Sequence, residues 1–508
     1  MKFEDVTITK AEVERLQGRG YNDDILPEPT VARKMDVKNF FTLWMGSVHN
    51  VPNYNAVAGF LFPAAGGIIL GLSPLNVMFA IAIAGVLVTV FLVLNGVAGS
   101  KYGIPFAIHL RSTYGNLGAK LPGFLRGCVA AIGWFAVQTY LGSKALYIIL
   151  VKLFPAFANI APGVDILGIS VPGLIAFMVF WAANVAIGFG GGGVLNKFTA
   201  ILSPLIYILV ISMTVWAVGA AGGIGAIMSY QVVSEGAVNP VFAYFVIFSS
   251  VLAVWAAPGA SICDFTRDAK STETQAKGQA LGLIVGYVVF AICSVIIMVG
   301  GSIHDGIQYL DILELIGNWS SMPAVVFAML CFLLSTISTN ATGNIIPAAY
   351  QLSALLPGKI DYHKGILIAS IISIVILPWK LMEGGGISTF LNTIGAVLGP
   401  VAGCMMANFY FVSKQKLDLE QLYMSPAADK SRNPYYGLKK SAYVATIAAL
   451  ILCLAGDFVP QLSAISNVSW FVGFFASAAI YVLLKRFEKD DVEKDGNARL
   501  SEKTDSAC

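Results

Sequence analysis

Long apolar runs separated by short polar segments dominate the chain, and this pattern predicts membrane-spanning helices. An uncharged run of about 18–20 apolar residues is long enough to cross the hydrocarbon core of a bilayer. Twelve runs meet this description, at 40–63, 75–99, 127–151, 169–188, 198–219, 240–262, 279–302, 321–345, 364–380, 387–411, 440–457 and 465–485. The pattern therefore predicts an all-α polytopic membrane protein with twelve transmembrane helices.

Composition supports the same class. Of the 508 residues, 57% are hydrophobic and 12% are charged, and the mean hydropathy is +0.75. Soluble domains carry about 25% charged residues, so the expected partner is the lipid bilayer. The net charge of +3 does not indicate a nucleic-acid partner, because the basic residues follow the predicted topology. The seven cysteines are scattered without paired spacing, so neither a disulfide framework nor a zinc site is predicted.

Lys and Arg residues are unevenly distributed between the predicted spans. If the N-terminus is cytoplasmic, 29 of the 32 fall in cytoplasmic segments, and the other three are Lys144, Lys152 and Lys380. An excess of Lys and Arg marks the cytoplasmic side, so both termini are expected in the cytoplasm, with the chain in the plasma membrane (the inner membrane of a bacterium). Arg126 belongs to the cytoplasmic segment 101–126 in this scheme, and no Arg, Asp or Glu lies near the centre of a predicted span.

One transmembrane domain, residues 39–486, is predicted between two polar tails at 1–38 and 487–508, which we expect to be mobile or partly ordered. The longest internal polar loop, 413–438, could hold a short surface helix. The stretch GFGGGG (188–193) formally matches a dinucleotide-binding motif. It follows a membrane span and not a strand, so we interpret it as a cytoplasmic turn between the fourth and fifth spans.

Two predicted spans contain a helix-breaking proline near their middle. The first span is interrupted near HNVPN (49–53), and the sixth near Ala257-Pro258-Gly259. Proline removes a backbone donor and clashes with the preceding turn, and a freed carbonyl is costly in lipid unless it lines a cavity. Each proline alone could be a structural kink. The matched pair indicates a transporter with inverted five-helix repeats, about 39–219 and 240–411, followed by two helices at 440–485.

Polar and aromatic side chains recur at a similar depth in several spans. Singly, each could bond its own helix or a neighbouring helix. Together, two indoles and several amides suit a flat, uncharged, hydrogen-bonding solute, because rings stack and amides present a donor beside an acceptor. Hydroxyl groups beside freed carbonyls suit a dehydrated cation. The residues are Trp134, Gln138, Trp255, Ser335, Ser338, Thr339, Asn340, Asn344, Leu391 and Asn392.

His49 is the one titratable residue expected at this depth. Its ring could carry a coupling proton, or its backbone carbonyl could bind a cation, and the residues favour neither. Two other classes of protein are weighed here. An integral membrane enzyme is disfavoured because no metal pair, nucleophile–base set or carboxylate pair occurs at a span end, and no cofactor is expected. A passive channel would give uptake that neither saturates nor responds to a cation gradient.

The chain resembles the nucleobase–cation symport-1 transporters over nearly its whole length, from RGYNDDILPEP near the N-terminus to the twelfth span. Within that family it looks closest to bacterial allantoin permeases, through FTLWMGSVHNVPNYN, GFGGGGVLNKFTAIL and ILPWKLME. The most specific stretches are GSKYGIPFAIHLRSTYG (99–115), GWFAVQTY (133–140), SICDFTRDA (261–269), STNATGNIIPAAY (338–350) and FLNTIGAVLGP (390–400).

This resemblance implies a LeuT-like fold with inverted repeats, broken helices 1 and 6, and transport by alternating access. It also implies a small, neutral, planar substrate from purine catabolism or a hydantoin, taken up with Na⁺ or H⁺. By position in the family motifs, Trp134 and Trp255 would sandwich the substrate ring. Gln138 and Asn344 would bond its polar edge, Asn50 would flank it, and Leu391 would belong to a thin gate.

The resemblance also implies a cation site formed by carbonyls of Gly46, His49 and Ser335 and the hydroxyls of Ser338 and Thr339. The sodium-using pattern of the family has alanine at the position of Ser335 and an apolar residue at the position of His49, so Na⁺ and H⁺ both remain open. We expect a symporter that imports allantoin or a closely related ureide or hydantoin. A nucleobase symporter for uracil or cytosine is the alternative.

Overall fold

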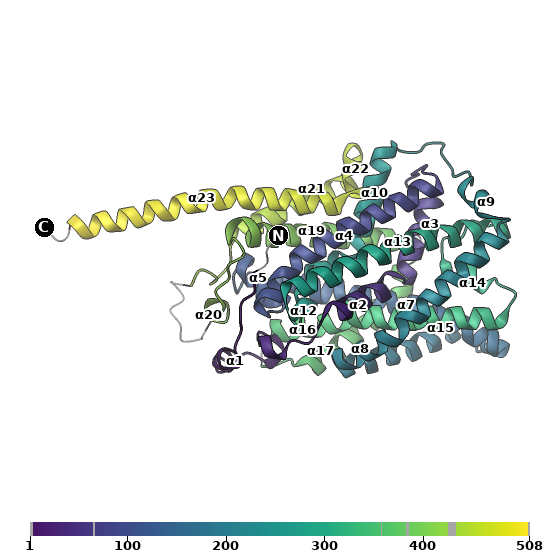
Figure 1. Cartoon of the computed structure of the whole chain (residues 1–508), viewed down its shortest axis with the longest axis horizontal. Coiled ribbons are helices and arrows are strands. Elements are labelled where there is room, and N and C mark those ends of the chain that lie inside the picture. Colours follow the sequence, from purple (N-terminus) through teal and green to yellow (C-terminus); the bar gives the residue numbers. More distant parts are fainter. Residues whose placement is uncertain (1–3, 64–66, 357, 383–385, 425–432, 506–508) are drawn as a thin grey trace.

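A computed structural model describes residues 4–63, 67–356, 358–382, 386–424 and 433–505, with the side chains of 191–203, 386–388 and 489–505 left out. Its regular structure is helical apart from one antiparallel pair of two-residue strands, β1 (Asp165–Ile166) and β2 (Ile169–Ser170). The long helices run side by side along the longest axis of the molecule, and both termini lie towards one end of it (Figure 1).

In the described chain, eight helical segments are long and apolar enough to cross a membrane. They fall at eight of the predicted spans, which bears out the multi-span class. The segments are built from α4 (Pro74–Tyr102), α6 (Lys120–Phe124) with η3 (Leu125–Ala130) and α7 (Ala131–Leu153), the first part of α8 (Val171–Ala220), α13 (Thr272–Asp305), α15 (Met322–Asn340) with η5 (Ala341–Ile345) and α16 (Ile346–Leu355), α19 (Gly386–Ala407) with η7 (Asn408–Val412), α21 (Lys440–Phe458) and α23 (Ser469–Asp505).

The other four predicted spans are also helical. Three of them are shorter apolar helices, namely the second part of α8 from Pro204, α10 (Pro240–Val254) and α17 (Tyr362–Val375). The remaining one is a pair of short helices, α2 (Val37–Val48) and α3 (Val51–Leu61). Every predicted span therefore coincides with a helix, whereas the count of twelve membrane crossings stays a prediction.

Helix α8 differs from the expectation of a turn between the fourth and fifth spans. It is a single helix of 50 residues that contains the glycine-rich stretch 188–193, so the predicted turn is wrong. Among apolar surroundings a helix satisfies its own backbone groups, and glycine allows the helical conformation although it does not favour it. A straight helix of this length would be roughly 75 Å long, more than twice the thickness of a hydrocarbon core.

The two interruptions follow the same local rule. Helix α2 ends at Val48, four residues before Pro52, and α10 ends at Val254, four residues before Pro258. A proline ring clashes with the carbonyl four residues earlier and offers it no hydrogen, which explains both ends. The second interruption therefore lies at Trp255, two residues before the stretch Ala257-Pro258-Gly259 near which it was expected, and that stretch forms the short helix α11 (Ala256–Ala260).

The long helices pack as groups around these interruptions. In one group, α13 packs along α4 and α2, and α10 packs along α4. In another group, α7 packs along α15 and α8, and α16 packs along α17. The last group joins α19 to α21 and α23. The interrupted helices thus belong to one group and face the uninterrupted α7 and α15 of another.

The N-terminal segment, which was expected to be mobile or partly ordered, is described from residue 4 onward. It contains α1 (Lys10–Gln17), η1 (Asp23–Ile25) and η2 (Thr30–Ala32), and it buries Leu16, Ile25 and Leu26. Arg15 and Arg19 form ion pairs with Glu420 of α20 (Leu419–Leu422). Helix α20 also confirms the short surface helix expected within 413–438.

Short elements complete the chain. They are α5 (Phe106–Tyr114), η4 (Pro155–Asn159), α9 (Ile224–Met228), α12 (Cys263–Thr266), α14 (Ile312–Gly317), α18 (Pro378–Leu381), η9 (Pro460–Leu462) and α22 (Ser463–Asn467). Near α14, Lys144 forms an ion pair with Asp311, and its Nζ lies 3.9 Å from Glu314 Oε1. Lys144, which lies within the third predicted span, therefore meets carboxylates of the segment 303–320 between the seventh and eighth spans.

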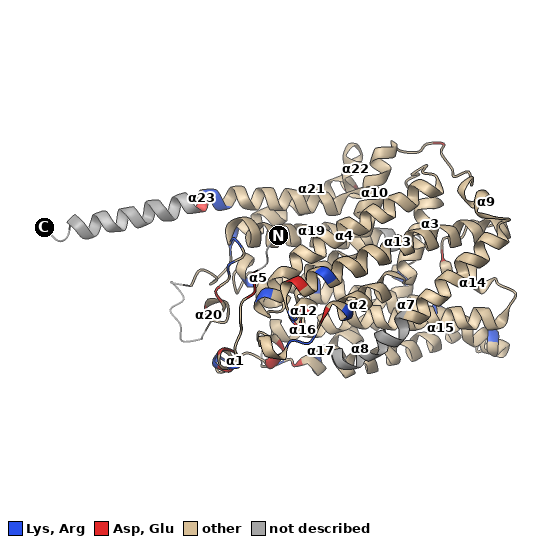
Figure 2. Ribbon diagram, viewed as in Figure 1, with Lys and Arg blue, Asp and Glu red and all other residues tan. Residues whose placement is uncertain are grey.

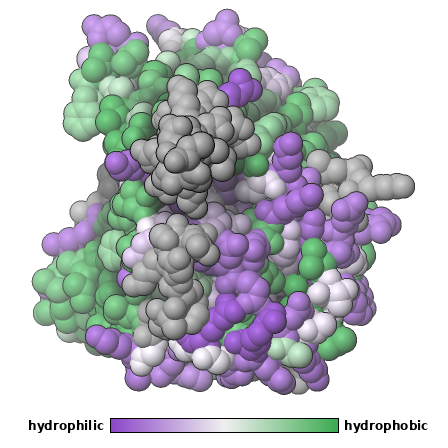
Figure 3. Space-filling view, turned by 90° about the vertical axis from the view of Figure 1, so that its left-hand side faces the viewer, coloured by the Kyte–Doolittle hydropathy of each residue, from purple (hydrophilic) through white to green (hydrophobic). Residues whose placement is uncertain are grey.

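Charged residues gather at the end of the molecule that holds α1, α5 and α20 (Figure 2). The space-filling view of that end shows hydrophilic groups over its lower and central parts and hydrophobic groups at its left-hand margin (Figure 3). Arg126 is an exception, because it is fully buried in η3, inside an apolar segment that begins at Lys120. Its assignment to a cytoplasmic loop is wrong, since the third helix starts several residues earlier than the apolar run.

Candidate substrate-binding site

A small cavity, about 30 Å³ in volume, lies where the two interrupted helices face α7 and α15. Five of the six residues expected to bind substrate line this cavity, and none of the nine lining residues is charged. The lining residues are Asn50, Trp134, Gln138, Val254, Trp255, Pro258, Thr339, Gly343 and Asn344. Residues from four separate spans are thus brought together around one neutral, polar and aromatic space.

Two indoles form aromatic walls of the cavity. Trp134 packs edge-on against Phe390, with 5.1 Å between ring centroids. Trp255 packs edge-on against Trp44 at 5.4 Å and donates its Nε1 hydrogen to Tyr287 Oη. The Nε1 of Trp134 is buried and has no hydrogen-bond partner among the described residues. One wall is therefore held in place by a hydrogen bond, while the other keeps a donor available.

A row of amides supports the polar side of the cavity. Asn344 Nδ2 donates to Asn340 Oδ1 at 2.8 Å. Asn340 Nδ2 in turn contacts Thr139 Oγ1 at 3.0 Å and Asn184 Oδ1 at 3.2 Å. Gln138 Oε1 is buried without a hydrogen-bond partner in the described chain. The network orients Asn344, and it leaves the Gln138 oxygen as an acceptor that a ligand can satisfy.

Asn50 has a structural role that the sequence did not indicate. Its Oδ1 accepts the backbone N–H of Asn53 at 3.0 Å, which caps the N-terminus of α3, and its Nδ2 donates to Ser47 O at 2.8 Å. Asparagine is among the preferred N-cap residues. The side chain thus closes the interruption and also lines the cavity.

Leu391, the sixth expected residue, is buried but does not line this cavity. Its neighbour Phe390 makes the contact with Trp134. Phe390 and Tyr287 contact the two indoles without lining the cavity, and neither was expected from the sequence. Phe390 lies in the motif FLNTIGAVLGP and could have been considered there, whereas nothing in the sequence around Tyr287 links it to Trp255.

The volume of the cavity describes a closed state of the site. To hold one water molecule, a cavity needs at least about 10–15 Å³ that is accessible to the centre of the molecule. The 30 Å³ measured in the same way is enough for about two water molecules. A substrate made of a ring with an attached ureido group is larger than this cavity, so the walls must separate before such a substrate can bind. The groups that can move apart are the interrupted helices on one side and α7 with α15 on the other.

Hydroxyl groups of α15 meet the first interruption beside the cavity. Ser335 Oγ donates to His49 O at 2.7 Å, and Thr339 Oγ1 donates to Ser335 O at 3.0 Å. Gly46 lies in the last turn of α2, three residues before His49. Ser338 is buried in the same turn of α15 as Ser335. This arrangement places neutral oxygens at the end of a helix whose backbone is interrupted.

The ring of His49 points away from the substrate cavity. Its Nδ1 lies 3.0 Å from Tyr54 Oη, and the rings of Tyr207 and Phe290 pack edge-on against it at 4.8 and 5.5 Å. Nε2 is buried without a hydrogen-bond partner in the described chain. His49 is absent from the lining of the cavity, so its carbonyl, and not its ring, is the group that reaches α15.

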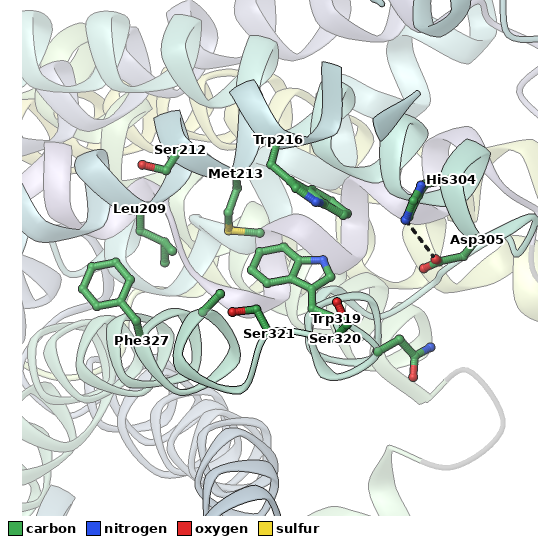
Figure 4. A pocket seen from close by; sticks show the side chains of 12 residues that line it. Leu209, Ser212, Met213, Trp216, His304, Asp305, Trp319, Ser320, Ser321 and Phe327 are labelled. Carbon is green, nitrogen blue, oxygen red and sulfur yellow. Dashed lines mark ion pairs between the residues drawn. The ribbon is translucent and has the colours of Figure 1, made fainter. Parts of the chain in front are cut away.

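A larger cavity of about 450 Å³ lies at the opposite end from the termini, between α8, the end of α13 and the start of α15. Trp216 and Trp319 pack against each other in its lining, with 4.8 Å between ring centroids, and Figure 4 shows the ion pair of His304 and Asp305 at one side. It contains none of the residues expected to bind substrate or cation. The small cavity between the interruptions is therefore the candidate substrate site, despite its size.

The fold and the site together define a multi-span membrane transporter whose cavity lies between interrupted helices. A family model described as permease for cytosine/purines, uracil, thiamine, allantoin matches residues 27–473. The chain belongs to this family, the nucleobase–cation symport-1 transporters, whose members are permeases and not enzymes.

Known proteins are similar over most of the chain. An Escherichia coli (strain K12) protein provisionally named an allantoin permease is 48% identical, covering 95% of this chain and 98% of that protein. The allantoin permease of Bacillus subtilis (strain 168) is 33% identical, covering 94% and 95%. The structure of Mhp1 in a closed conformation with bromovinylhydantoin bound aligns with a TM-score of 0.74 at 20% identity, covering 92% and 95%, which shows a common fold.

Proposed function

We propose that this protein is a symporter that imports allantoin, or a closely related ureide or hydantoin, across the plasma membrane by alternating access. The observation that carries this proposal is the neutral cavity between the interruptions, where two indoles stand beside unbonded polar atoms of Gln138 and Trp134. Allantoin is flat over its ring and presents N–H groups beside carbonyls, which this lining complements. The two allantoin permeases similar to the chain over at least 94% of its length support the same substrate class.

The proposed binding residues are those that the family resemblance implies, and all of them except Leu391 line the cavity. Trp134 and Trp255 stack on the faces of the ring, and Gln138 and Asn344 bond its polar edge. Asn50 flanks the ring while it caps α3, and Leu391 gates access next to Phe390. In this proposal α2, α3, α10 and α11 move relative to α7 and α15, so that the site opens to one side of the membrane at a time.

A coupling cation is the second part of the proposal. The oxygens of His49, Ser335 and Thr339 converge by hydrogen bonding, and Gly46 of α2 lies three residues before His49. Neutral carbonyl and hydroxyl oxygens can replace the water shell of a dehydrated Na⁺. These groups would hold the ion together with Ser338, and a bound ion would attach the first interruption to α15. The ring of His49 is the site at which H⁺ coupling would be tested.

One experiment tests the proposed substrate and coupling together. Uptake of labelled allantoin is measured in cells or proteoliposomes, with unlabelled hydantoin, uracil and cytosine as competitors, with and without Na⁺ at two pH values. We expect saturable uptake that hydantoin inhibits and that a cation gradient stimulates. Stronger inhibition by uracil or cytosine would replace the proposal with a nucleobase symporter, and uptake that does not saturate would indicate a channel.

A further inference from the structure

A buried arginine joins the two helix groups beside the substrate cavity. Arg126 is fully buried in η3, the π-helical segment that precedes α7. An ionisable side chain inside a membrane segment is costly, and where it occurs it usually pairs with carboxylates or backbone carbonyls and serves function. The sequence analysis placed this residue in a loop, so no role was assigned to it.

The guanidinium group of Arg126 bonds to both walls of the site. Its Nε donates to Ala257 O and contacts Ser261 Oγ at 3.1 Å, both at the second interruption. Its Nη2 donates to Gly343 O at 2.9 Å, in the π-helical turn η5 of the eighth span. A planar guanidinium presents several donors in a fixed fork, so it can hold two helices at once.

These bonds lie between two cavities. On one side is the substrate cavity, whose lining includes Gly343 and Pro258. Gly343 carries one of the bonded carbonyls, and Pro258 follows Ala257, which carries the other. On the other side is a pocket of about 220 Å³ that is lined by Tyr21 of the N-terminal segment and by Gly123 and Gln351. The same helical segments line both cavities, since Gly123 precedes Arg126 by one turn and Gln351 follows Gly343 by about two.

The pocket at Gly123 and Gln351 lies on the side that the distribution of Lys and Arg assigns to the cytoplasm. It also contains Arg111 and Lys120, and it opens beside the ordered N-terminal segment. A substrate that leaves the cavity towards the cytoplasm must therefore pass the contact between Arg126, Ala257 and Gly343. The contact holds that path closed.

The closed contact is not fully satisfied. Arg126 Nη1 is buried and has no hydrogen-bond partner among the described residues. A buried donor without a partner disfavours the state that contains it. When the path opens, water can bond every donor of the guanidinium group. The closed state is therefore held by the hydrogen bonds of Arg126, but the unpaired donor lowers the free energy needed to open it.

We propose that Arg126 is a positioning residue that closes the substrate cavity on the cytoplasmic side, and that inward opening requires its bonds to Ala257 O or Gly343 O to break. The inference rests on the proposed transport function but not on the identity of the substrate. It predicts that weakening this contact shifts the protein towards an inward-open state.

The test measures access to the cytoplasmic pocket in the absence of substrate and cation. Ala354, which lines this pocket, is replaced by Cys in a Cys128→Ser, Cys508→Ser background, and labelling by a membrane-impermeant maleimide is followed in inside-out vesicles. Arg126→Lys keeps the charge, but a single ammonium cannot bond carbonyls of both helices in the same geometry. We expect labelling to accelerate about tenfold, as for loss of a charge-assisted hydrogen bond.

Two further variants make the result interpretable. Ser261→Ala removes one acceptor without touching the arginine, and it should raise the labelling rate in the same direction by a smaller factor. Arg111→Lys is the matched control, because Arg111 lines the same pocket but bonds Tyr21 Oη and Leu422 O, away from the substrate cavity. Unchanged labelling in folded Arg126→Lys protein would overturn the proposal. The proposed substrate is tested separately, because the labelling assay contains no allantoin and its result does not depend on allantoin uptake.

Discussion

The interruption between α2 and α3 and the one between α10 and α11 both lie one turn before a proline, yet their freed backbone groups are satisfied differently. At the first interruption, Asn50 Nδ2 bonds Ser47 O and Asn53 Nδ2 bonds Val48 O, at 2.8 and 2.7 Å. All of these groups lie within seven consecutive residues. The first interruption therefore carries two capping amides of its own, and His49 O is bonded from another helix, by Ser335 of α15.

The second interruption depends on other helices. Asn95 of α4 donates to Gly259 O at 2.6 Å and Ala260 O at 3.2 Å, and Arg126 donates to Ala257 O. No side chain of α10 or α11 caps α11 in the described structure. The two interruptions therefore differ in the source of their capping side chains, which is one short segment in the first case and the neighbouring α4 and η3 in the second.

The largest effect is expected where both interruptions face the substrate. Gln138→Ala and Asn344→Ala each leave a polar group of the bound substrate unpaired, which costs about 1–3 kcal/mol. Allantoin uptake should fall by roughly one to two orders of magnitude while surface expression persists. Transport assays in expressing cells check this, with Gln231→Ala, an exposed glutamine, as the control. Near-normal uptake in both variants would remove these residues from the site.

Asn95→Leu tests whether the second interruption depends on α4. The change preserves the approximate size of the side chain and leaves Gly259 O and Ala260 O without their donor, at a cost of about 1–3 kcal/mol. We expect a lower melting temperature of the purified protein and uptake reduced by about tenfold. Asn76→Leu, at an exposed position of the same helix, is the control. An Asn95→Leu protein with unchanged stability would show that the second interruption is held in another way.

Substitutions of Asn50 separate capping from substrate binding at the first interruption. Serine is as good an N-cap as asparagine, whereas alanine loses about 0.5–2 kcal/mol. Asn50→Ser should therefore keep the thermal stability that Asn50→Ala loses, as measured by melting of the purified protein. If Asn50 also flanks the substrate, the serine variant loses affinity in uptake assays by about fivefold. Full uptake by the stable serine variant would limit Asn50 to its capping role.

The smallest effects are expected at the cation site. Thr339→Ala removes one oxygen ligand and should raise the half-saturating cation concentration about fivefold. Ser335→Ala should act in the opposite direction, because it removes the hydroxyl that occupies His49 O at 2.7 Å. Uptake is measured against Na⁺ concentration at fixed pH, and against pH without Na⁺. Identical cation dependence in both variants and the parent would place the coupling site elsewhere.

Much of the candidate site could be predicted because its residues stand in recognisable local patterns. Trp134 with Gln138, and Asn340 with Asn344, are pairs spaced four apart, and each pair shares a helix face. The structure places Trp134, Gln138 and Asn344 on one cavity. The hydrogen bond of Trp255 to Tyr287 and the ring contact of Phe390 could not be predicted in this way, because they join residues that no spacing relates.

The misplaced features share a physical cause. A hydrophobic run marks the apolar part of a helix, but a helix continues wherever its polar residues find partners. Arg126 was assigned to a loop because its charge ended the run, whereas backbone carbonyls of two other spans accept its hydrogens. The N-terminal segment was expected to be mobile or partly ordered because it is polar, and the ion pair of Arg19 with Glu420 joins it to a distant part of the chain that no local pattern indicates.

Local chemistry thus specified the helices, the ends of α2 and α10 four residues before each proline, and the amide groups that complete the first interruption. These features depend on backbone geometry and on the length of each hydrophobic run, and both are determined by residues that are close together in the sequence. The partners of the second interruption, the meeting of four spans around one cavity, and the burial of Arg126 depend on contacts between residues far apart in the chain. Only the packing of the helices brings those groups within hydrogen-bonding distance, so no local pattern could contain them.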